Sequence, residues 1–194
     1  MDKQITDRRI RKTKKLLREA LTELMSEKKL ENITIKDLTG KADLNRGTFY
    51  LHYRDIYDLL EQSEDGVLEE INIIMSKFDS SALIEFNLKN DPFPPLVELL
   101  EYFADNMNFC ETLMGPKGNI SFLERLTAIL KKEYTKWVEI YGKKNDMIFN
   151  EYFIDYSQFG FIGIIKKWFD SNMETPSKEL AVIILKMLFN GLNY

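Results

Sequence analysis

Apolar residues recur at helical spacing along almost the whole chain. Between residues 10 and 25 they fall three or four positions apart, on one face of a predicted helix that spans about 7–28. Between 55 and 78 the same period continues for more than twenty residues, which predicts one long helix. No segment shows the two-residue alternation that is typical of a half-buried strand. The pattern therefore predicts an all-α fold.

Caps and helix breakers divide the other segments into seven further helices. Pro95 suits a first helical position, and the glycine-containing segment 115–118 ends the helix that follows it. Ser121 and Glu124 have the spacing of a capping box, which predicts the start of another helix. These helices should span about 34–42, 45–53, 80–89, 96–114, 121–141, 146–171 and 176–190. About nine helices are therefore expected.

A segment in the first third of the chain contains three short helical signals with almost no linker between them. Thr34 and Asp37 have the layout of a capping box, and Asn45 can cap the next helix. Asp43 lies between the two helices, where the chain must turn and where aspartate tolerates left-handed backbone geometry. Two short helices joined by a tight turn predict a helix-turn-helix motif, here spanning 34–53.

The second helix of this motif should present a polar and basic surface. Its first turn, from Asn45 to Thr48, points backbone N–H groups outward, which suits a phosphate group. Arg46 can reach either a phosphate or a guanine edge. Gly47 allows a DNA backbone to approach closely, and Phe49 should point into the core. The motif therefore predicts a DNA-binding head.

The motif closely resembles the head of the tetracycline-repressor (TetR) family of bacterial transcription regulators, through the run I-x-D-L-x-x-x-A-x-L-N-R-G-T-F-Y-L-H-Y-x-D. The specific resemblance covers residues from about 8 to 70. Beyond them, the chain is similar to the family in length and helical pattern. Two positions depart from the family pattern. Asp43 lies where the family prefers glycine, and Ile56 lies where many members carry a phosphate-binding lysine.

The resemblance implies a DNA-binding domain over 1–54 and a regulatory and dimerisation domain over 55–194. It implies a homodimer that binds a palindromic operator in double-stranded DNA, and that is released when an effector binds the C-terminal domain. Repression is the expected outcome for transcription. The residues expected to contact DNA are Thr34, Lys36, Asn45, Arg46, Gly47, Thr48, Tyr50, Leu51, His52 and Arg54.

Charge is distributed unevenly along the chain. Residues 1–60 contain 14 lysines and arginines against 10 acidic residues, a net charge of +4, whereas the remaining residues have 13 against 21, a net charge of −8. The basic residues of the first helix are Arg8, Arg9, Arg11, Lys12, Lys14, Lys15 and Arg18. They can form a solvated helix face or anchor phosphates. The motif in the same head favours phosphate anchoring.

Aromatic residues of the C-terminal half can fill an ordinary core or line a cavity for a small apolar or aromatic effector. The residues expected to contact this effector are Tyr102, Phe103, Phe122, Trp137, Phe153 and Tyr156. The effector should bind between the helix at 55–78 and the helices that start near Leu96 and Ser121. The family resemblance implies the cavity, whereas the residue types alone favour core packing for any one of these aromatics.

Two glycines, Gly160 and Gly163, lie on one face of a predicted helix and would let another helix approach closely. Together with Ile183 and Met187, they fit a dimer interface. Close packing within the chain is the alternative at this stage.

Other functional classes find little support in the composition. One cysteine, Cys110, cannot form an intramolecular disulfide, and one histidine leaves no histidine cluster for a metal. No cofactor is expected, and no nucleophile motif or glycine-rich phosphate loop indicates an enzyme. The longest apolar run, 159–165, is far shorter than the roughly 20 residues of a membrane span. With no signal-like apolar stretch near residue 1, a cytoplasmic protein without a membrane partner is expected.

Two alternatives to this regulator remain. One is a regulator or coactivator that answers to a protein partner. The other is a helical interaction module without small-ligand sensing, whose head has lost DNA binding. The joint presence of Arg46, Thr48, Tyr50 and His52 favours a head that binds DNA.

Overall fold

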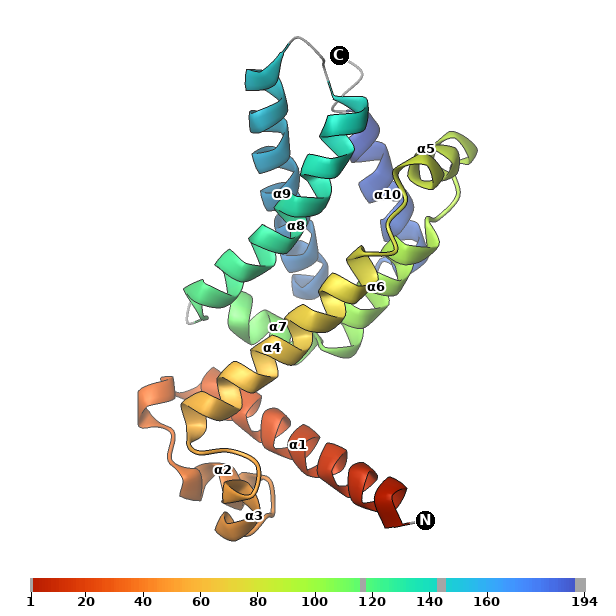
Figure 1. The fold of residues 1–194 in the computed structure, drawn as a ribbon. Coiled ribbons are helices and arrows are strands. Elements are labelled where there is room, and N and C mark those ends of the chain that lie inside the picture. The colour runs from red at the N-terminus through yellow and green to blue at the C-terminus, as the bar shows by residue number, and fades with distance from the viewer. Residues whose placement is uncertain (1, 116–117, 143–145, 191–194) are drawn as a thin grey trace. The chain divides into compact units, whose positions relative to one another are not determined.

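The computed structural model describes residues 2–115, 118–142 and 146–190, with side chains from residue 8 to residue 189 within these ranges. The described residues form ten α-helices and one short 3-10 helix, and no strand (Figure 1). The all-α prediction is confirmed, with one helix more than expected. Positions 116–117 of the predicted break at 115–118 lie outside the described residues.

The helices group into two compact units. The first unit comprises residues 1–67 with 115–118, and the second comprises residues 68–114 and 119–194. The division falls inside α4 (Ile56–Met75), so this helix contributes residues to both units. The boundary expected after residue 54 divides a DNA-binding domain from a regulatory and dimerisation domain. This division by function stays a prediction.

In the first unit, α1 (Asp2–Glu27) packs against α2 (Ile35–Lys41), and α2 packs against α3 (Arg46–Tyr50). The short 3-10 helix η1 (Leu30–Asn32) connects the first two of these helices. One buried core lies between α1, α2, α3 and the first residues of α4, because each of these α-helices contributes apolar side chains to it. Its fully buried members include Leu17, Leu21, Leu38, Phe49 and Leu59.

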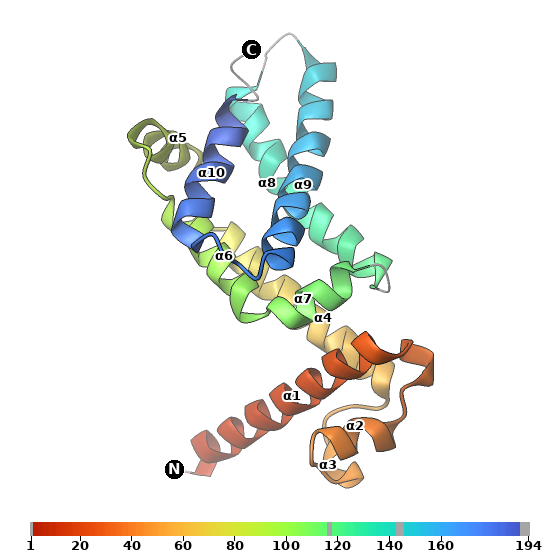
Figure 2. The same ribbon diagram turned by 180° about the vertical axis from the view of Figure 1, so that it is seen from behind.

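In the second unit, α8 and α9 run side by side in opposite directions (Figures 1 and 2). The next helix, α10, packs against α5 and α6, while α7 packs against α8 and α9. The bounds are α5 (Ser80–Lys89), α6 (Pro94–Asp105), α7 (Met107–Met114), α8 (Ile120–Tyr141), α9 (Met147–Asp170) and α10 (Ser177–Asn190). None of the described helices is both long enough and apolar enough to cross a membrane.

The additional helix arises because the predicted segment 96–114 is interrupted at Asn106. This residue leaves helical geometry, with φ −113° and ψ 18°, and ends α6. Its side-chain Nδ2 donates to the carbonyl oxygen of Tyr102 at 2.9 Å, and its own carbonyl oxygen accepts from Cys110 N at 3.0 Å. Asparagine often hydrogen-bonds to nearby backbone in this way, so it favours a cap over a helix interior.

Two other predicted boundaries differ from the structure. The capping box at Ser121 and Glu124 is wrong, because Asn119 caps α8 by accepting a hydrogen bond from Ser121 N at 3.1 Å. Asparagine is as good an N-cap as serine and comes earlier in the chain. The second motif helix was expected to reach residue 53, but α3 ends at Tyr50.

Candidate functional site

Local hydrogen bonds fix the start of α2. Thr34 Oγ1 accepts from Asp37 N at 3.1 Å, and Asp37 Oδ2 accepts from Thr34 N at 3.0 Å, which confirms the predicted capping box. Lys28 Nζ also donates to Asp37 Oδ2 at 2.7 Å. The hydrogen bond from Lys28, followed by those from Thr34, lowers the pKa of Asp37 to about 2. Thr34 remains exposed, and its hydroxyl is still able to donate.

The turn after α2 is a Schellman motif. Asp43 has φ 52°, in the left-handed region. Leu44 N donates to the carbonyl oxygen of Thr39 at 2.9 Å, and Asp43 N donates to that of Gly40 at 3.4 Å. These are the two hydrogen bonds of that motif. Aspartate therefore supports the same tight turn for which the family prefers glycine.

The turn leads directly into α3, which is capped by Asn45. Asn45 Oδ1 accepts from Gly47 N at 2.9 Å, as predicted, so the side-chain amide is left with two donors. Phe49 is fully buried, whereas Tyr50 and Leu51 are 58% and 79% exposed. Capping and burial thus anchor α3 on one side and leave its polar side open.

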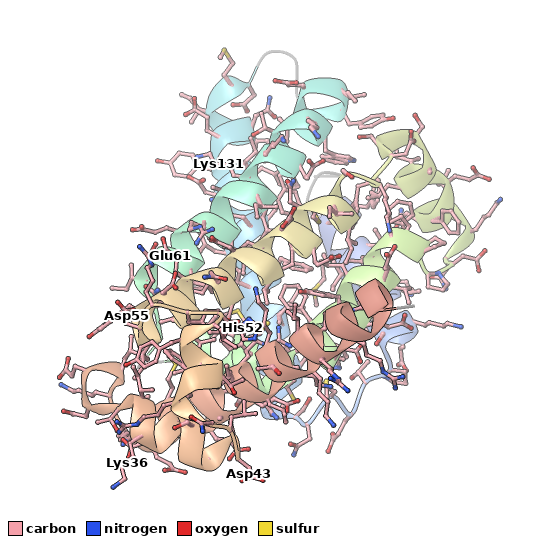
Figure 3. The ribbon with its side chains drawn as sticks, turned by 60° about the horizontal axis from the view of Figure 1, so that its bottom comes forward. Lys36, Asp43, His52, Asp55, Glu61 and Lys131 are labelled. Carbon is pink, nitrogen blue, oxygen red and sulfur yellow. The ribbon has the colours of Figure 1, made fainter. Side chains whose placement is uncertain are left out.

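Eight of the ten residues expected to contact DNA are exposed, and Thr48 and His52 are half-buried. All ten lie in α2, α3 or the segments next to them. Lys36 projects outward from α2 in Figure 3. The first unit therefore brings these side chains together on neighbouring elements, while their contact with DNA stays a prediction.

Lysines and arginines of the first unit differ in whether an acid already neutralises them. Lys41 Nζ lies 2.9 Å from a carboxylate oxygen of Glu23 and 2.9 Å from one of Glu27. These hydrogen bonds raise the pKa of Lys41. Lys36 and Arg46, by contrast, are exposed and have no ion pair within the described residues. Their charges are available to an external anion such as a phosphate.

The loop after α3 is held by Asp58, a residue that sequence reasoning missed. Asp58 Oδ2 accepts from Arg54 N at 2.8 Å, and Oδ1 accepts from Arg54 Nη2 at 3.1 Å and from Gln62 Nε2 at 3.2 Å. The hydrogen bonds from Arg54 lower the pKa of Asp58 to about 2. The four-residue spacing from Arg54 was the available signal. Ile56 is buried, so it offers no phosphate contact.

The second unit contains a cavity of about 670 Å³, counting the part open to solvent. It lies between the end of α4, α6 and α8, the three helices expected to surround an effector, and α5, α9 and α10 complete its wall. The lining residues are Met75, Phe78, Ser80, Leu83, Leu96, Leu99, Leu130, Glu133, Tyr134, Lys136, Trp137, Phe161, Ile184, Leu185 and Leu188. A mostly apolar lining with a few polar groups is typical of sites that bind small ligands.

Among the six residues expected to contact an effector, Trp137 lines this cavity. Phe153 and Tyr156 line a second, more open groove between α8, α9 and α10. Phe103 and Phe122 are buried and Tyr102 is half-buried, and none of these three lines either space. Tyr134, which lines both spaces, was not among the expected residues. Helical spacing identifies an apolar face but does not show which of its residues border empty space.

Four residues were expected at a dimer interface, all on α9 or α10. Gly163 and Met187 are exposed, and Gly160 and Ile183 are half-buried. A Cβ atom built on either glycine would meet no heavy atom within 4 Å. The glycines therefore do not serve a close helix contact within the described chain.

The outer face of α9 is unusually apolar near these glycines. Ile148, Tyr152, Tyr156 and Phe159 are 62–75% exposed. They are spaced four, four and three residues apart, so they follow one face of the helix. Large exposed apolar surfaces of this kind mark interaction sites.

A family model described as "Transcriptional regulator C-terminal region" of the TetR group matches residues 90–190. The match covers more than half of the chain, and it falls in the half where the motif resemblance is absent. The chain belongs to the TetR family of transcriptional regulators. TetR-family proteins are DNA-binding regulators of transcription and not enzymes.

Other proteins are similar to this TetR-family chain. The HTH-type transcriptional regulator YxbF of Bacillus subtilis is 41% identical over 100 residues, which span 51% of the chain and only 26% of that relative. A TetR regulator from Streptococcus agalactiae has a similar fold, with a TM-score of 0.62 at 24% identity, covering 95% of this chain and 98% of the other. FadR from Bacillus subtilis, solved with stearoyl-CoA, has a TM-score of 0.59 at 15% identity, covering 92% and 98%.

Proposed function

We propose that this chain is a transcriptional repressor that binds a palindromic operator as a homodimer and releases it when an effector binds the second unit. The observation that carries the proposal is the pair of exposed, unpaired cations, Lys36 on α2 and Arg46 on α3, in a helix-turn-helix. Charges left without an internal partner, on the two helices of a helix-turn-helix, favour nucleic acid as the partner.

On DNA, α3 would enter the major groove while α2 crosses the backbone. Arg46, in the first turn of α3, would read a base edge, and Tyr50 extends the same exposed surface. Lys36 and the exposed residues Arg8, Arg9 and Lys12 would hold phosphates, because none of them has an ion pair within the described residues.

Dimerisation would use α9 and α10. The exposed apolar face of α9 has no cover within the described chain, and Gly160 and Gly163 leave room for a second helix to approach. A second copy of the same chain would cover this face in an isologous, two-fold interface. The groove lined by Gly160 and Met187 would then receive side chains of the partner.

Release would begin at the cavity of the second unit. Met75, the last residue of α4, borders this cavity, and the first residues of the same helix belong to the first unit. A ligand that prefers one position of Met75 and its neighbours shifts the equilibrium of α4 by its differential affinity for the two arrangements. The fold neighbour FadR binds stearoyl-CoA, which supports an effector of apolar character.

The experiment is selection of bound genomic fragments by the purified chain, followed by gel-shift titration at several salt concentrations. Arg46→Ala should weaken operator binding by about 1–3 kcal/mol and relax the sequence preference at the base that Arg46 contacts. Transcription in vitro from the selected promoter should fall when the chain is added. Absence of salt-sensitive binding to every fragment would contradict the proposal, and increased transcription would contradict repression alone.

A further inference from the structure

A buried hydrogen-bond donor lacks an acceptor beside the cavity of the second unit. Trp137 is 6% exposed and lines this cavity. Its indole Nε1 is buried and has no hydrogen-bond partner among the described residues. The other tryptophan, Trp168, donates from Nε1 to the carbonyl oxygen of Thr175 at 2.7 Å. Burying a donor without an acceptor destabilises a folded chain, so the Trp137 donor requires an explanation.

The surroundings of the indole ring do not supply the missing acceptor. Its ring neighbours are Tyr141, Phe153 and Phe189, with centroid distances of 5.6, 5.9 and 5.8 Å. A single water molecule would itself need about two to four polar partners, and most residues around the cavity are apolar. A molecule bound in the cavity can supply this acceptor to Nε1.

Charges at the cavity indicate whether this molecule is ionised. Glu133 and Lys136 are the charged residues of the lining, and Lys136 Nζ donates to Glu133 Oε1 at 2.7 Å. Burial raises the pKa of Tyr134, so its hydroxyl is uncharged at neutral pH. A charged ligand group would compete with Glu133 for Lys136 or stay unpaired among apolar side chains. An uncharged acceptor has neither cost.

We propose that the cavity binds an uncharged, largely apolar molecule that carries a carbonyl-type acceptor, and that this acceptor bonds to Trp137 Nε1. Ketones and esters have this chemistry, and free carboxylic acids, which ionise at neutral pH, do not. The inference rests on the effector part of the proposed function, and it is independent of DNA binding. Trp137 then determines which apolar molecules the regulator detects.

The test compares matched probes on the complete chain without DNA. Benzophenone and diphenylmethane differ in one carbonyl group, as do 2-undecanone and undecane, and diphenylacetate adds a charged comparison. Calorimetric or thermal-shift titration should give tighter binding of a ketone than of its hydrocarbon. Trp137→Phe should lower the affinity for a ketone about fivefold more than the affinity for its hydrocarbon, because only the ketone loses one neutral hydrogen bond. Trp168→Phe is the matched control, and it should leave both affinities unchanged.

A second measurement observes the Trp137 indole directly in the unsubstituted chain. The sequence contains two tryptophans, so a ¹H–¹⁵N spectrum contains two indole N–H signals, which the two variants assign. The ketone should move the Trp137 signal downfield, and the hydrocarbon should not. Equal binding of both ketones and their hydrocarbons, or tighter binding of diphenylacetate, would overturn the inference. Because DNA is absent, either result leaves the proposed operator binding to be judged by its own experiment.

Discussion

Lys36 and Lys41 are five residues apart in α2, yet their electrostatic surroundings differ. Lys41 contacts two carboxylates on α1, whereas Lys36 has no ion pair within the described residues. A lysine that is ion-paired with two carboxylates contributes to the stability of the fold, and its charge attracts a DNA phosphate less strongly. An unpaired lysine releases counterions when it meets a phosphate. At the scale of the residue, the partner of each cation therefore distinguishes a structural lysine from one that we propose contacts DNA.

The first prediction uses these two lysines as a matched pair. Lys36→Ala should weaken binding to all DNA sequences to a similar degree and reduce the slope of log affinity against log salt by about 0.9, because one phosphate contact is lost. Lys41→Ala removes the same charge but should leave the slope unchanged while lowering the urea midpoint of unfolding. Gel-shift titrations between low and moderate salt measure the slopes. Equal slopes for the two variants would contradict the assignment of Lys36.

Asp43 occupies a left-handed turn in which glycine has no steric cost. Asp43→Gly should stabilise the chain by about 1 kcal/mol or less, and should strengthen DNA binding because an acidic side chain next to Asn45 is removed. Asp43→Asn retains tolerance of the left-handed region, so it should strengthen binding without a change in stability. Urea unfolding and gel shift together separate the two effects. A less stable glycine variant would show that the aspartate side chain has a structural role.

Asp58 should make the stability of the head depend on pH. Its pKa is lowered from an ordinary value of 3.8 to about 2, so its hydrogen bonds with Arg54 contribute stability that is complete above about pH 4 and lost as the pH falls through 2. Asp58→Asn should therefore be less stable than the parent chain at pH 7, and the difference should shrink toward pH 2. Glu61→Gln, which removes an exposed acid from the same helix, is the control and should change little. Urea midpoints measured from pH 2 to pH 7 at one protein concentration provide the comparison.

At the scale of the element, α9 has two faces with different tasks. Phe161, Ile165 and Trp168 are buried in the second unit, whereas the face with Tyr156 and Phe159 is exposed. A helix that is apolar on both faces is stable in water only when the second face is also covered. We therefore expect a partner helix on this face, because the described chain places no heavy atom of a packed neighbour within 4 Å of a Cβ atom built on either glycine.

Gly163→Leu should test this face. Leucine favours a helix more than glycine does, by about 0.8–1 kcal/mol, and a Cβ atom at this position meets no heavy atom of the packed neighbours within 4 Å, so the monomer should not be destabilised. The bulky side chain should still hold two copies of α9 apart and weaken dimerisation. Gly66→Leu, at another open helical glycine, is the control. Sedimentation velocity over a concentration series reports the association. An unchanged dimer in the Gly163 variant would exclude Gly163 from the interface.

At the scale of the whole molecule, a two-fold dimer imposes its own spacing on the DNA that it binds. Two copies of α3 in successive major grooves should require half-sites about one helical turn, 34–36 Å, apart. Inserting about five base pairs between the half-sites rotates one of them to the opposite side of the duplex, so affinity should fall to that of a single head. Gel shift on operator variants with graded insertions measures this dependence. Affinity that is insensitive to the spacing would indicate that the heads bind independently.

Local patterns in the sequence determined much of the head. The Thr34 capping box, the left-handed Asp43 and the Asn45 cap each depend on groups within five residues of one another, so they can be inferred before any folding is known. Helical periodicity likewise predicted nearly all of the helices. The exceptions are at Asn106 and Asn119, where a side chain competes with the helix for a backbone group. Several nearby residues could have formed the same caps, so the sequence pattern did not identify these two.

Only the tertiary structure decided which charged and polar side chains have a partner within the described chain and which do not. Lys41 meets Glu23 and Glu27 across two helices, while Lys36 does not, and no spacing in the sequence distinguishes them. The same holds for Trp137, whose unpaired Nε1 and adjoining cavity depend on how five other segments pack around it. Hydrogen bonding within a helix is a property of neighbouring residues, whereas burial, ion pairing and empty space arise from residues far apart in the chain.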